Sequence, residues 1–318
     1  MKPLVILTGP TAVGKTELSI SLAKAIGGEI ISADSMQVYK YMDIGTAKIR
    51  PEEMQDVPHH LIDILDPKVS FNVAMFKELA KKAVDEIYER GHIPIIVGGT
   101  GFYIQALLYD IDFSEEDTDS VIRDELEKTA AEKGSEYLHE CLRQVDPESA
   151  EAIHHHNVKR VIRALEFYRM HGEKISVHNE RERQKVSPYN FLYFVLTNDR
   201  SVLYDRIEKR IDQMIEEGLV AEVDNLLKMG YNRELVSMQG LGYKEFVPYL
   251  NHECSLEDSI YVLKRDTRHF AKRQLTWFRR ERDVRWLDKS KVSSENELLK
   301  EILDTINKEW GLNHEGNV

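Results

Sequence analysis

The sequence predicts an α/β protein, in which a parallel β-sheet has helices on both faces and a separate helical domain is inserted. Three observations predict this fold. Short apolar runs alternate with helical patterns through the first third of the chain, as in a parallel sheet with crossover helices. A glycine-rich turn stands where the first apolar run meets the first helix. After Ile111 the strand pattern stops, and charged helical patterns continue until one further apolar run at residues 191–196.

The first strand leads into the sequence GPTAVGKT at residues 9–16. An apolar run at residues 4–8 precedes this motif and a helical pattern at residues 16–26 follows it, which is the context of a phosphate-binding P-loop. Its glycines let backbone N–H groups face one anion, while the helix N-terminus and Lys15 add positive charge. A turn that merely needs glycine would not also require Lys15 and Thr16. The core is therefore predicted to be P-loop NTPase-like.

This loop predicts a di- or triphosphate ligand, with the hydroxyl of Thr16 available to Mg²⁺. The motif does not identify the molecule that carries the phosphates, nor does it show that phosphate is the group transferred. The predicted phosphate-binding residues are Gly9, Pro10, Thr11, Ala12, Val13, Gly14, Lys15 and Thr16.

The next elements place two more segments beside the P-loop. Residues 29–32 and 93–97 are predicted strands, and residues 76–90 are a predicted helix that ends before Gly91. Ligands of such sheets lie at the carboxyl ends of the strands. Because ISADS and GGTGFY both follow predicted strands, we expect them at the same edge of the sheet as the P-loop.

Asp34 is the carboxylate of the first of these segments. A carboxylate there can hold Mg²⁺, or it can accept a proton from an incoming nucleophile. It can also simply cap the next helix with its side-chain oxygen. The strand end and the neighbouring Lys15 and Thr16 favour a functional role.

The second segment, GGTGFYIQAL at residues 98–107, offers Thr100 as a hydroxyl or backbone N–H donor to an anion. Glycines after a strand are as often packing devices, so both interpretations stay open. His59 and His60 are predicted to lie in a loop that orders or lines the site, because no second cluster has metal-ligand spacing. The run at residues 154–156, three histidines, is predicted to be a solvated start of a helix rather than a metal site.

The remaining patterns divide the chain. Residues 114–186 are predicted to form a helical insertion domain between two parts of one core, residues 1–113 and 187–318. One strand is expected at residues 191–196, and helices from there to the C-terminus.

Composition restricts the class of protein. Two cysteines, Cys141 and Cys254, are too few for a disulfide framework or a structural zinc site. The start of the chain has no charged leader, and no stretch of about 18 apolar residues occurs. We therefore expect a soluble cytoplasmic protein with no membrane association. A monomer is also expected, although nothing in the composition determines the oligomeric state.

The net charge of −12 hides two basic segments. Residues 112–151 carry fourteen acids and four bases, whereas residues 264–285 carry nine bases and three acids. A second basic segment, at residues 151–174, combines four lysines and arginines at residues 159–169 with the histidine run. The chain is acidic overall but contains two basic segments.

These bases leave two functions open. Arg206 and Arg210 share a helix face, where they are either solvated or aimed at a leaving phosphate. In TRHFAKRQLTWFRR, bases and aromatics alternate on one predicted helix, which fits either a nucleic-acid face or an amphipathic helix. The protein is then either a P-loop nucleotide or small-molecule kinase, or an enzyme whose P-loop holds a different phosphorylated donor and whose basic segments hold an RNA acceptor. The long basic helix favours the second.

Seven segments together resemble one family. GPTAVGKT, DSMQVYKYMDIGTAK, PHHLID, GGTGFYIQAL, NVKRVIRALE, MQGLGYKE and TRHFAKRQLTWFRR are similar, in this order, to segments of the tRNA dimethylallyltransferase (isopentenyl-tRNA transferase) family. The resemblance covers roughly residues 4–286. Eukaryotic members carry a C-terminal zinc finger, which this sequence does not contain, so the bacterial form is expected.

The resemblance implies both substrates. The P-loop of this family holds dimethylallyl diphosphate with Mg²⁺, and the dimethylallyl group passes to the N6 amine of the adenine 3′ of the anticodon, in tRNAs that read codons beginning with U. The catalytic residues would be Asp34 as the base, with Thr100 and Arg210 acting on the diphosphate; Thr16 and Asp34 would hold the metal.

The resemblance also implies contacts to the anticodon stem-loop of tRNA, over which the insertion domain would close. The residues concerned are Asp34, Ser35, Met36, Gln37, Thr100, Arg123, Lys159, Arg160, Val161, Ile162, Arg163, Met238, Gln239, Gly240, Leu241, Gly242, Tyr243, Lys272, Arg273, Gln274, Trp277 and Arg279.

Overall fold

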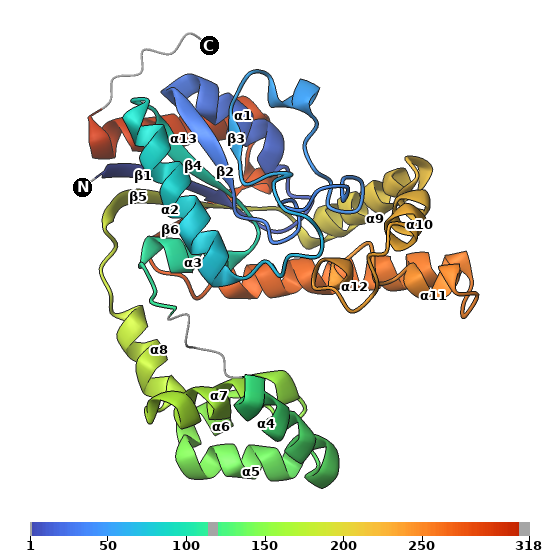
Figure 1. Cartoon of the computed structure of the whole chain (residues 1–318). Helices are drawn as coiled ribbons and strands as arrows, with labels where there is room; N and C mark the ends of the chain where they lie inside the picture. Colours follow the sequence, from blue (N-terminus) through green and yellow to red (C-terminus); the bar gives the residue numbers. More distant parts are fainter. Residues whose placement is uncertain (1, 114–119, 312–318) are drawn as a thin grey trace. The chain divides into compact units, whose positions relative to one another are not determined.

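A parallel sheet forms the core of the computed structural model, which describes residues 2–113 and 120–311 (Figure 1). Six strands lie in the order β3-β2-β4-β1-β5-β6, and every neighbouring pair is parallel. The strands are β1 (Lys2–Thr8), β2 (Gly28–Ser32), β3 (His59–His60), β4 (Ile93–Gly98), β5 (Tyr189–Thr197) and β6 (Val284–Asp288). The predicted parallel α/β core is confirmed.

Helices cover both faces of this sheet. The connection from β1 through α1 (Lys15–Ile26) to β2 runs in one direction along the sheet, and the connection from β3 through α2 (Val73–Glu89) to β4 runs in the other. Right-handed crossovers in opposite directions put the two helices on opposite faces. The last helix, α13 (Glu295–Trp310), packs against α1 and so lies on the same face as α1.

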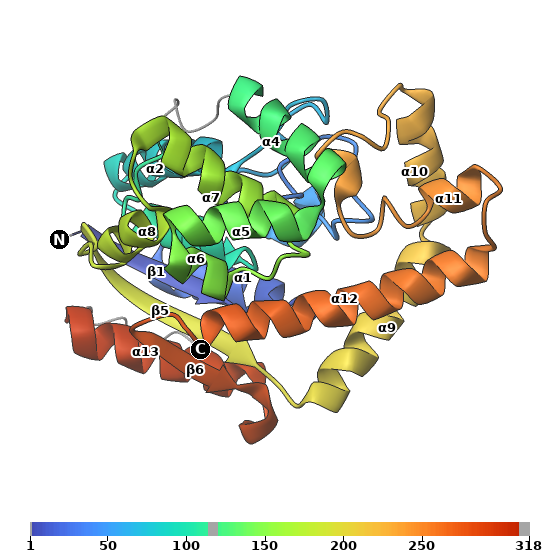
Figure 2. The ribbon, with the colours of Figure 1, turned by 90° about the horizontal axis from the view of Figure 1, so that it is seen from below.

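A second group of helices extends beyond the carboxyl ends of the strands. Figure 2 shows α9 and α12 running side by side, and the two helices are in contact. The remaining elements of the core are α3 (Gly101–Leu108), α9 (Arg200–Glu216), α10 (Leu219–Lys228), α11 (Val247–Leu250) and α12 (Leu256–Phe278), with the 3₁₀ turns η1 (Pro51–Met54), η2 (Ser237–Gln239) and η3 (Lys289–Lys291).

Two strands were not expected from the sequence. The prediction of helices from residue 197 to the C-terminus is wrong at β6, which pairs with β5 at the edge of the sheet. Its sequence VRWLD buries one side chain, Leu287, so the apolar pattern of an internal strand is missing. The strand β3 is formed by His59 and His60 beside β2, so the predicted loop is wrong at these residues. Neither histidine lines the cavity described below.

Residues 108–187 form a second compact unit with its own core. Five helices make it: α4 (Ser120–Lys133), α5 (Ser135–Val145), α6 (Pro147–Ala152), α7 (Val158–His171) and α8 (Ile175–Arg183). The core contains Leu126, Leu138, Leu142, Val161 and Leu165. The domain boundary expected at residue 114 lies outside the described residues, and the structure separates the units at Leu108 and Ser187.

None of the described helices is both long and apolar enough to cross a membrane.

Candidate active site

The P-loop has the backbone of an anion cradle. Gly9 and Gly14 have φ values of 147° and 90°, which other residues rarely adopt. A Cβ at Gly9 would also lie 2.6 Å from the carbonyl oxygen of Leu196. The ammonium of Lys15 donates to the carbonyl oxygens of Gly9 at 3.0 Å and Pro10 at 2.9 Å. The predicted Thr16 lies exposed on the first turn of α1.

Three charged groups face one another beside this loop. Burial, with a contribution from the neighbouring Arg210, lowers the pKa of Lys15 to about 8, while Asp34 acts in the opposite sense. Burial also lowers the pKa of Arg210, and Asp34 again opposes the shift. The cations are thus poorly solvated and incompletely neutralised, which favours binding of an anion at this point.

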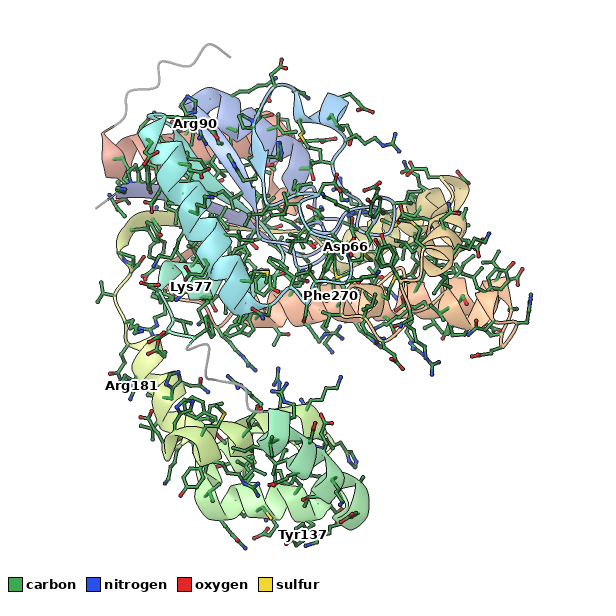
Figure 3. The ribbon with its side chains drawn as sticks, viewed as in Figure 1. Asp66, Lys77, Arg90, Tyr137, Arg181 and Phe270 are labelled. Atoms are coloured by element: carbon green, nitrogen blue, oxygen red, sulfur yellow. The ribbon has the colours of Figure 1, made fainter. Side chains whose placement is uncertain are left out.

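A cavity of about 620 Å³ opens at the same place. Asp34, Thr100 and Arg210 line it together with Thr11 and Ala12 of the P-loop. Apolar side chains also line it, most of them from α9 and α12, and they include Phe270, which Figure 3 labels on α12. The apolar lining comprises Met36, Phe71, Tyr103, Ile207, Ile211, Met214, Leu263 and Phe270. The cavity therefore combines a subsite that can bind an anion with room for a hydrocarbon group.

Asp34 is held in place by one of its two oxygens. Its Oδ1 accepts hydrogen bonds from the backbone N–H of Met36 at 2.8 Å and of Gln37 at 3.3 Å. Among the described residues no hydrogen bond reaches Oδ2. The local capping role that the sequence left open is thus present, and it leaves the second oxygen available to a ligand or a proton.

The glycines around Thr100 serve close packing. A Cβ at Gly98 would lie 2.2 Å from the carbonyl oxygen of Ala33, and one at Gly99 would lie 2.1 Å from Gln274 Nε2. A Cβ at Gly101 would meet the ring of Trp277 at 2.2 Å. The approaches at Gly99 and Gly101 bring α12 against the turn. Thr100 nevertheless lines the cavity. The glycines therefore serve packing, and this does not exclude a role of Thr100 in binding an anion.

Gln274 is turned inward. Its side-chain oxygen accepts a hydrogen bond from the N–H of Thr11 at 2.9 Å, and its amide donates to Gly99 O at 3.0 Å. The side chain is buried. Trp277 packs on Gly101 and, edge to face, on Phe102. Both polar ends of the side chain are therefore used inside the protein, and the contact of Gln274 with RNA stays a prediction.

The bases of α12 fall into two groups. Lys264 and Arg268 form ion pairs with α9, at 2.5 Å to Asp212 and 2.6 Å to Glu208. The second group has no carboxylate at ion-pair distance within the described part of the chain, and it comprises the exposed bases Lys272, Arg273 and Arg279. Lys272 and Arg279 are seven residues apart and therefore lie on one side of the helix end, and Arg273 is the next residue after Lys272. This second group is available to an external polyanion.

Hydrogen bonds connect the loop at residues 34–48 to α10. Glu222 accepts hydrogen bonds from three consecutive backbone N–H groups, at residues 43–45, and from the hydroxyl of Tyr243. Gly45 leaves room for that ring, since a Cβ there would lie 2.6 Å from it. Gln37 is also used internally, because its amide donates to the carbonyl oxygens of Thr46 and Ala47 at 3.3 Å. Sequence patterns could not single out Glu222.

The segment MQGLGYKE forms another wall of the cavity. Gln239, Gly240, Leu241 and Gly242 line it, as does Ser35 from the facing loop. In contrast, the predicted contacts Met238 and Tyr243 are fully buried, so their side chains support the segment from within.

The predicted contacts on the helical unit also divide by burial. Lys159 and Arg160 are exposed at the start of α7, whereas Val161 and Ile162 belong to the unit's core. The buried carboxylate of Glu166 binds Arg123 at 2.7 Å and lies 3.5 Å from Arg163. Two predicted arginines thus share an internal acid, and two predicted apolar residues are core.

One cation near the P-loop was missed by sequence analysis. A Cβ at Gly14 would lie 2.9 Å from Lys289 Nζ and 3.5 Å from a guanidinium nitrogen of Arg206. Lys289 follows β6 and pairs with Glu295 at 2.9 Å. Arg206 was noted through its spacing from Arg210, but no pattern connects the distant Lys289 with the P-loop.

A profile of the family described as IPP transferase matches residues 37–281. A protein of Lachnoclostridium phytofermentans named tRNA dimethylallyltransferase is 61% identical over 306 residues, which cover 96% of this chain and 98% of that one. The chain belongs to the IPP transferase family. A second member, from Carboxydothermus hydrogenoformans and with the same name, is 53% identical over 98% of both chains.

Solved structures of this family have the same fold. The tRNA isopentenylpyrophosphate transferase of Bacillus halodurans aligns with a TM-score of 0.74 at 46% identity, covering 99% of this chain and 100% of that one. A eukaryotic dimethylallyltransferase, described as acting on tRNA, aligns with a TM-score of 0.82 at 29% identity, over 98% of this chain and 79% of that one. The family resemblance predicted from seven sequence segments is confirmed.

Proposed function

We propose that this protein transfers the dimethylallyl group of dimethylallyl diphosphate to the N6 amine of the adenine 3′ of the anticodon, in tRNAs that read codons beginning with U. One observation carries the proposal. The lining of one cavity combines P-loop residues, Asp34, Thr100 and Arg210 with apolar side chains. A diphosphate ester of a short hydrocarbon needs both. The kinase alternative is not favoured, because relatives that match nearly the whole chain are named tRNA dimethylallyltransferase.

Different residues of the cavity would assist the departure of the diphosphate and the removal of the proton. Lys15, Arg210 and Thr100 would hold the diphosphate and stabilise its charge as the allylic C–O bond breaks. The N6 nitrogen would form the new bond to the allylic carbon and lose one proton to the free oxygen of Asp34. The products are the prenylated adenine, diphosphate and a proton carried first by the carboxylate.

The donor atoms fit Mg²⁺. Thr16 offers an exposed hydroxyl on the first turn of α1. The carboxylate oxygen of Asp34 that makes no other hydrogen bond among the described residues is the second candidate ligand, as the alternative to its role as proton acceptor. Mg²⁺ is usually held by one or two protein oxygens together with phosphate oxygens. When bound, the ion would supply positive charge to the leaving diphosphate.

The tRNA, which accepts the dimethylallyl group, would bind to two sets of exposed bases. Lys272, Arg273 and Arg279 at the end of α12 would bind the phosphate backbone, as would Lys159 and Arg160 on α7. An adenine in an anticodon loop can leave its stack and enter a cavity. We propose that the protein acts on tRNA in the cytoplasm as a monomer.

A parallel labelling experiment tests the function. The protein is incubated with unmodified tRNA and either labelled dimethylallyl diphosphate or γ-labelled ATP. Label should enter RNA from the prenyl donor alone, and only in tRNAs with adenine at that position. A tRNA with guanine there is the matched control. Transfer of label from ATP, or equal labelling of the guanine tRNA, would contradict the proposal.

A further inference from the structure

We propose that His154, His155 and His156 form a binding site for a divalent late first-row transition metal ion such as Zn²⁺. They lie in the turn between α6 and α7 of the helical unit. One ligand nitrogen from each histidine can be chosen so that all three lie within 4.8 Å of one another. The sequence alone favoured a solvated start of a helix, whereas the geometry shows that the three histidines are close enough for one metal ion.

The three rings are already in mutual contact. Their centroids are 4.4 Å apart for His154 and His155, 4.0 Å for His155 and His156, and 4.9 Å for His154 and His156. With Zn–N bonds of about 2.1 Å, two nitrogens on one tetrahedral ion are about 3.4 Å apart. His154 and His156 are exposed, so their rings can turn to close the remaining gap while the backbone stays in place.

The orphaned nitrogen of His155 is the second observation. Its Nδ1 is buried and has no hydrogen-bond partner among the described residues, which costs free energy. The nearby His139 is different, because its Nε2 lies 2.9 Å from Ala150 O and 2.8 Å from Ile153 O. His139 is therefore structural, whereas the Nδ1 of His155 has no hydrogen-bond partner among the described residues that a metal ion would have to replace.

One existing bond competes with the ion. His154 Nδ1 accepts a hydrogen bond from the N–H of His156 at 3.2 Å, so ligation has to displace this long bond or use the other ring nitrogen with a change of tautomer. Three imidazoles would leave a fourth tetrahedral position to water.

The donor chemistry selects the class of ion. Imidazole nitrogens suit Zn²⁺, Ni²⁺ and Cu²⁺, whereas Mg²⁺ prefers oxygen. This site is therefore separate from the Mg²⁺ of the proposed reaction. Its consequence would be local order, because the N–H of Asn157 donates to His154 O at 2.8 Å and Asn157 is the N-cap of α7. An ion on the histidines would fix the start of the helix that carries Lys159 and Arg160.

Calorimetric titration of the full chain with Zn²⁺ tests this, using protein free of any histidine tag. We expect one ion per chain, and at least about tenfold weaker binding in His155→Ala and in His156→Gln. His156 is exposed, so this second variant should fold even if the first does not. The matched control is His252→Asn, which changes an exposed histidine with a φ of 61° to a residue that tolerates this backbone.

Titration with Co²⁺ gives an independent readout, because a tetrahedral nitrogen site has strong visible absorption that a merely structural role of the histidines would not produce. Affinity should rise from Co²⁺ through Ni²⁺ to Cu²⁺. Absence of one-to-one binding in the wild type would overturn the site. So would equal weakening by His252→Asn, or full affinity in both cluster variants.

Discussion

The side-chain oxygen of Gln274 accepts a hydrogen bond from the backbone N–H of Thr11 at 2.9 Å. The same side chain donates to Gly99 O at 3.0 Å. One residue of α12 therefore joins the P-loop to the turn that carries Thr100. Since α12 also carries the exposed bases, this bond links the proposed RNA surface to the proposed diphosphate site.

We expect Gln274→Ala to impair transfer without weakening tRNA binding. Small misplacements of positioning groups can cost about 100-fold in rate, so kcat/KM should fall by about 10- to 100-fold in a steady-state assay. The dissociation constant for tRNA should stay within about twofold, because the side chain is buried. Lys272→Ala, which alters an exposed base two residues away, is the control and should show the reverse. Loss of tRNA affinity in Gln274→Ala would place this residue on the RNA after all.

Asp34→Asn separates the carboxylate's chemistry from its capping bonds. Asparagine can still accept hydrogen bonds from the N–H groups of Met36 and Gln37, but it cannot take a proton. We expect the rate of single-turnover transfer to fall by about 100- to 10,000-fold, with dimethylallyl diphosphate and tRNA still bound. Recovery of the rate at high Mg²⁺ would instead identify Asp34 mainly as a metal ligand. Near-normal turnover would remove it from both roles.

Arg273 and Arg268 lie on the same helix but have different surroundings. Arg268 is paired with Glu208 at 2.6 Å, whereas Arg273 is exposed and lines the cavity. Arg273→Ala should therefore weaken tRNA binding and reduce the slope of log K against log salt by about 0.7 to 1. Arg268→Ala, measured at the same salt concentrations, should leave the slope unchanged. Equal slopes in both variants would contradict the division of the helix into paired and available bases.

The lowered pKa of Lys15 predicts a pH dependence of anion binding. The pKa is about 8 in the free protein, and a bound diphosphate favours the charged ammonium. Binding above pH 8 must therefore take up a proton, so affinity for pyrophosphate should fall as pH rises through about 8, by at most about tenfold per pH unit. Lys15→Arg keeps its charge throughout this range and corrects for ionisation of pyrophosphate itself. A constant ratio of the two affinities between pH 7 and 9.5 would rule out the titration of Lys15.

The sequence predicted those parts of the site that follow from strand ends. Asp34 and Thr100 meet the P-loop because the carboxyl ends of parallel strands share one edge, and a short motif marks each of them. Gln274 bonds to Thr11 across 263 positions of the chain, and Lys289 approaches Gly14 from beyond an unpredicted edge strand. Such contacts depend on how the helices pack, and no local pattern encodes them.

Glu29 has a buried carboxylate at the start of β2, and its ionisation makes the stability of the fold depend on pH in the acid range. Glu29 is 1% exposed and binds the guanidinium of Arg90 at 2.8 and 2.7 Å, with His60 and His92 each at 2.7 Å. The bond from Arg90 is the main reason that the pKa of Glu29 lies at about 2 instead of 4.5, against the opposing effect of burial. Because the folded pKa is the lower one, the stabilisation is complete above pH 4.5 and is lost as pH falls towards 2.

Glu29→Gln should therefore lower the free energy of unfolding by about 2 to 3 kcal/mol at pH 7, measured by urea denaturation. The difference from wild type should stay constant above pH 5 and narrow below pH 4.5, since the wild type then loses the same stabilisation. Asp85→Asn is the matched control, because Asp85 pairs with Lys2 on the surface at 3.3 Å and such pairs contribute at most about 1 kcal/mol. A difference for Glu29→Gln that persists unchanged at pH 3 would mean that packing around the side chain, rather than its charge, stabilises this end of the sheet.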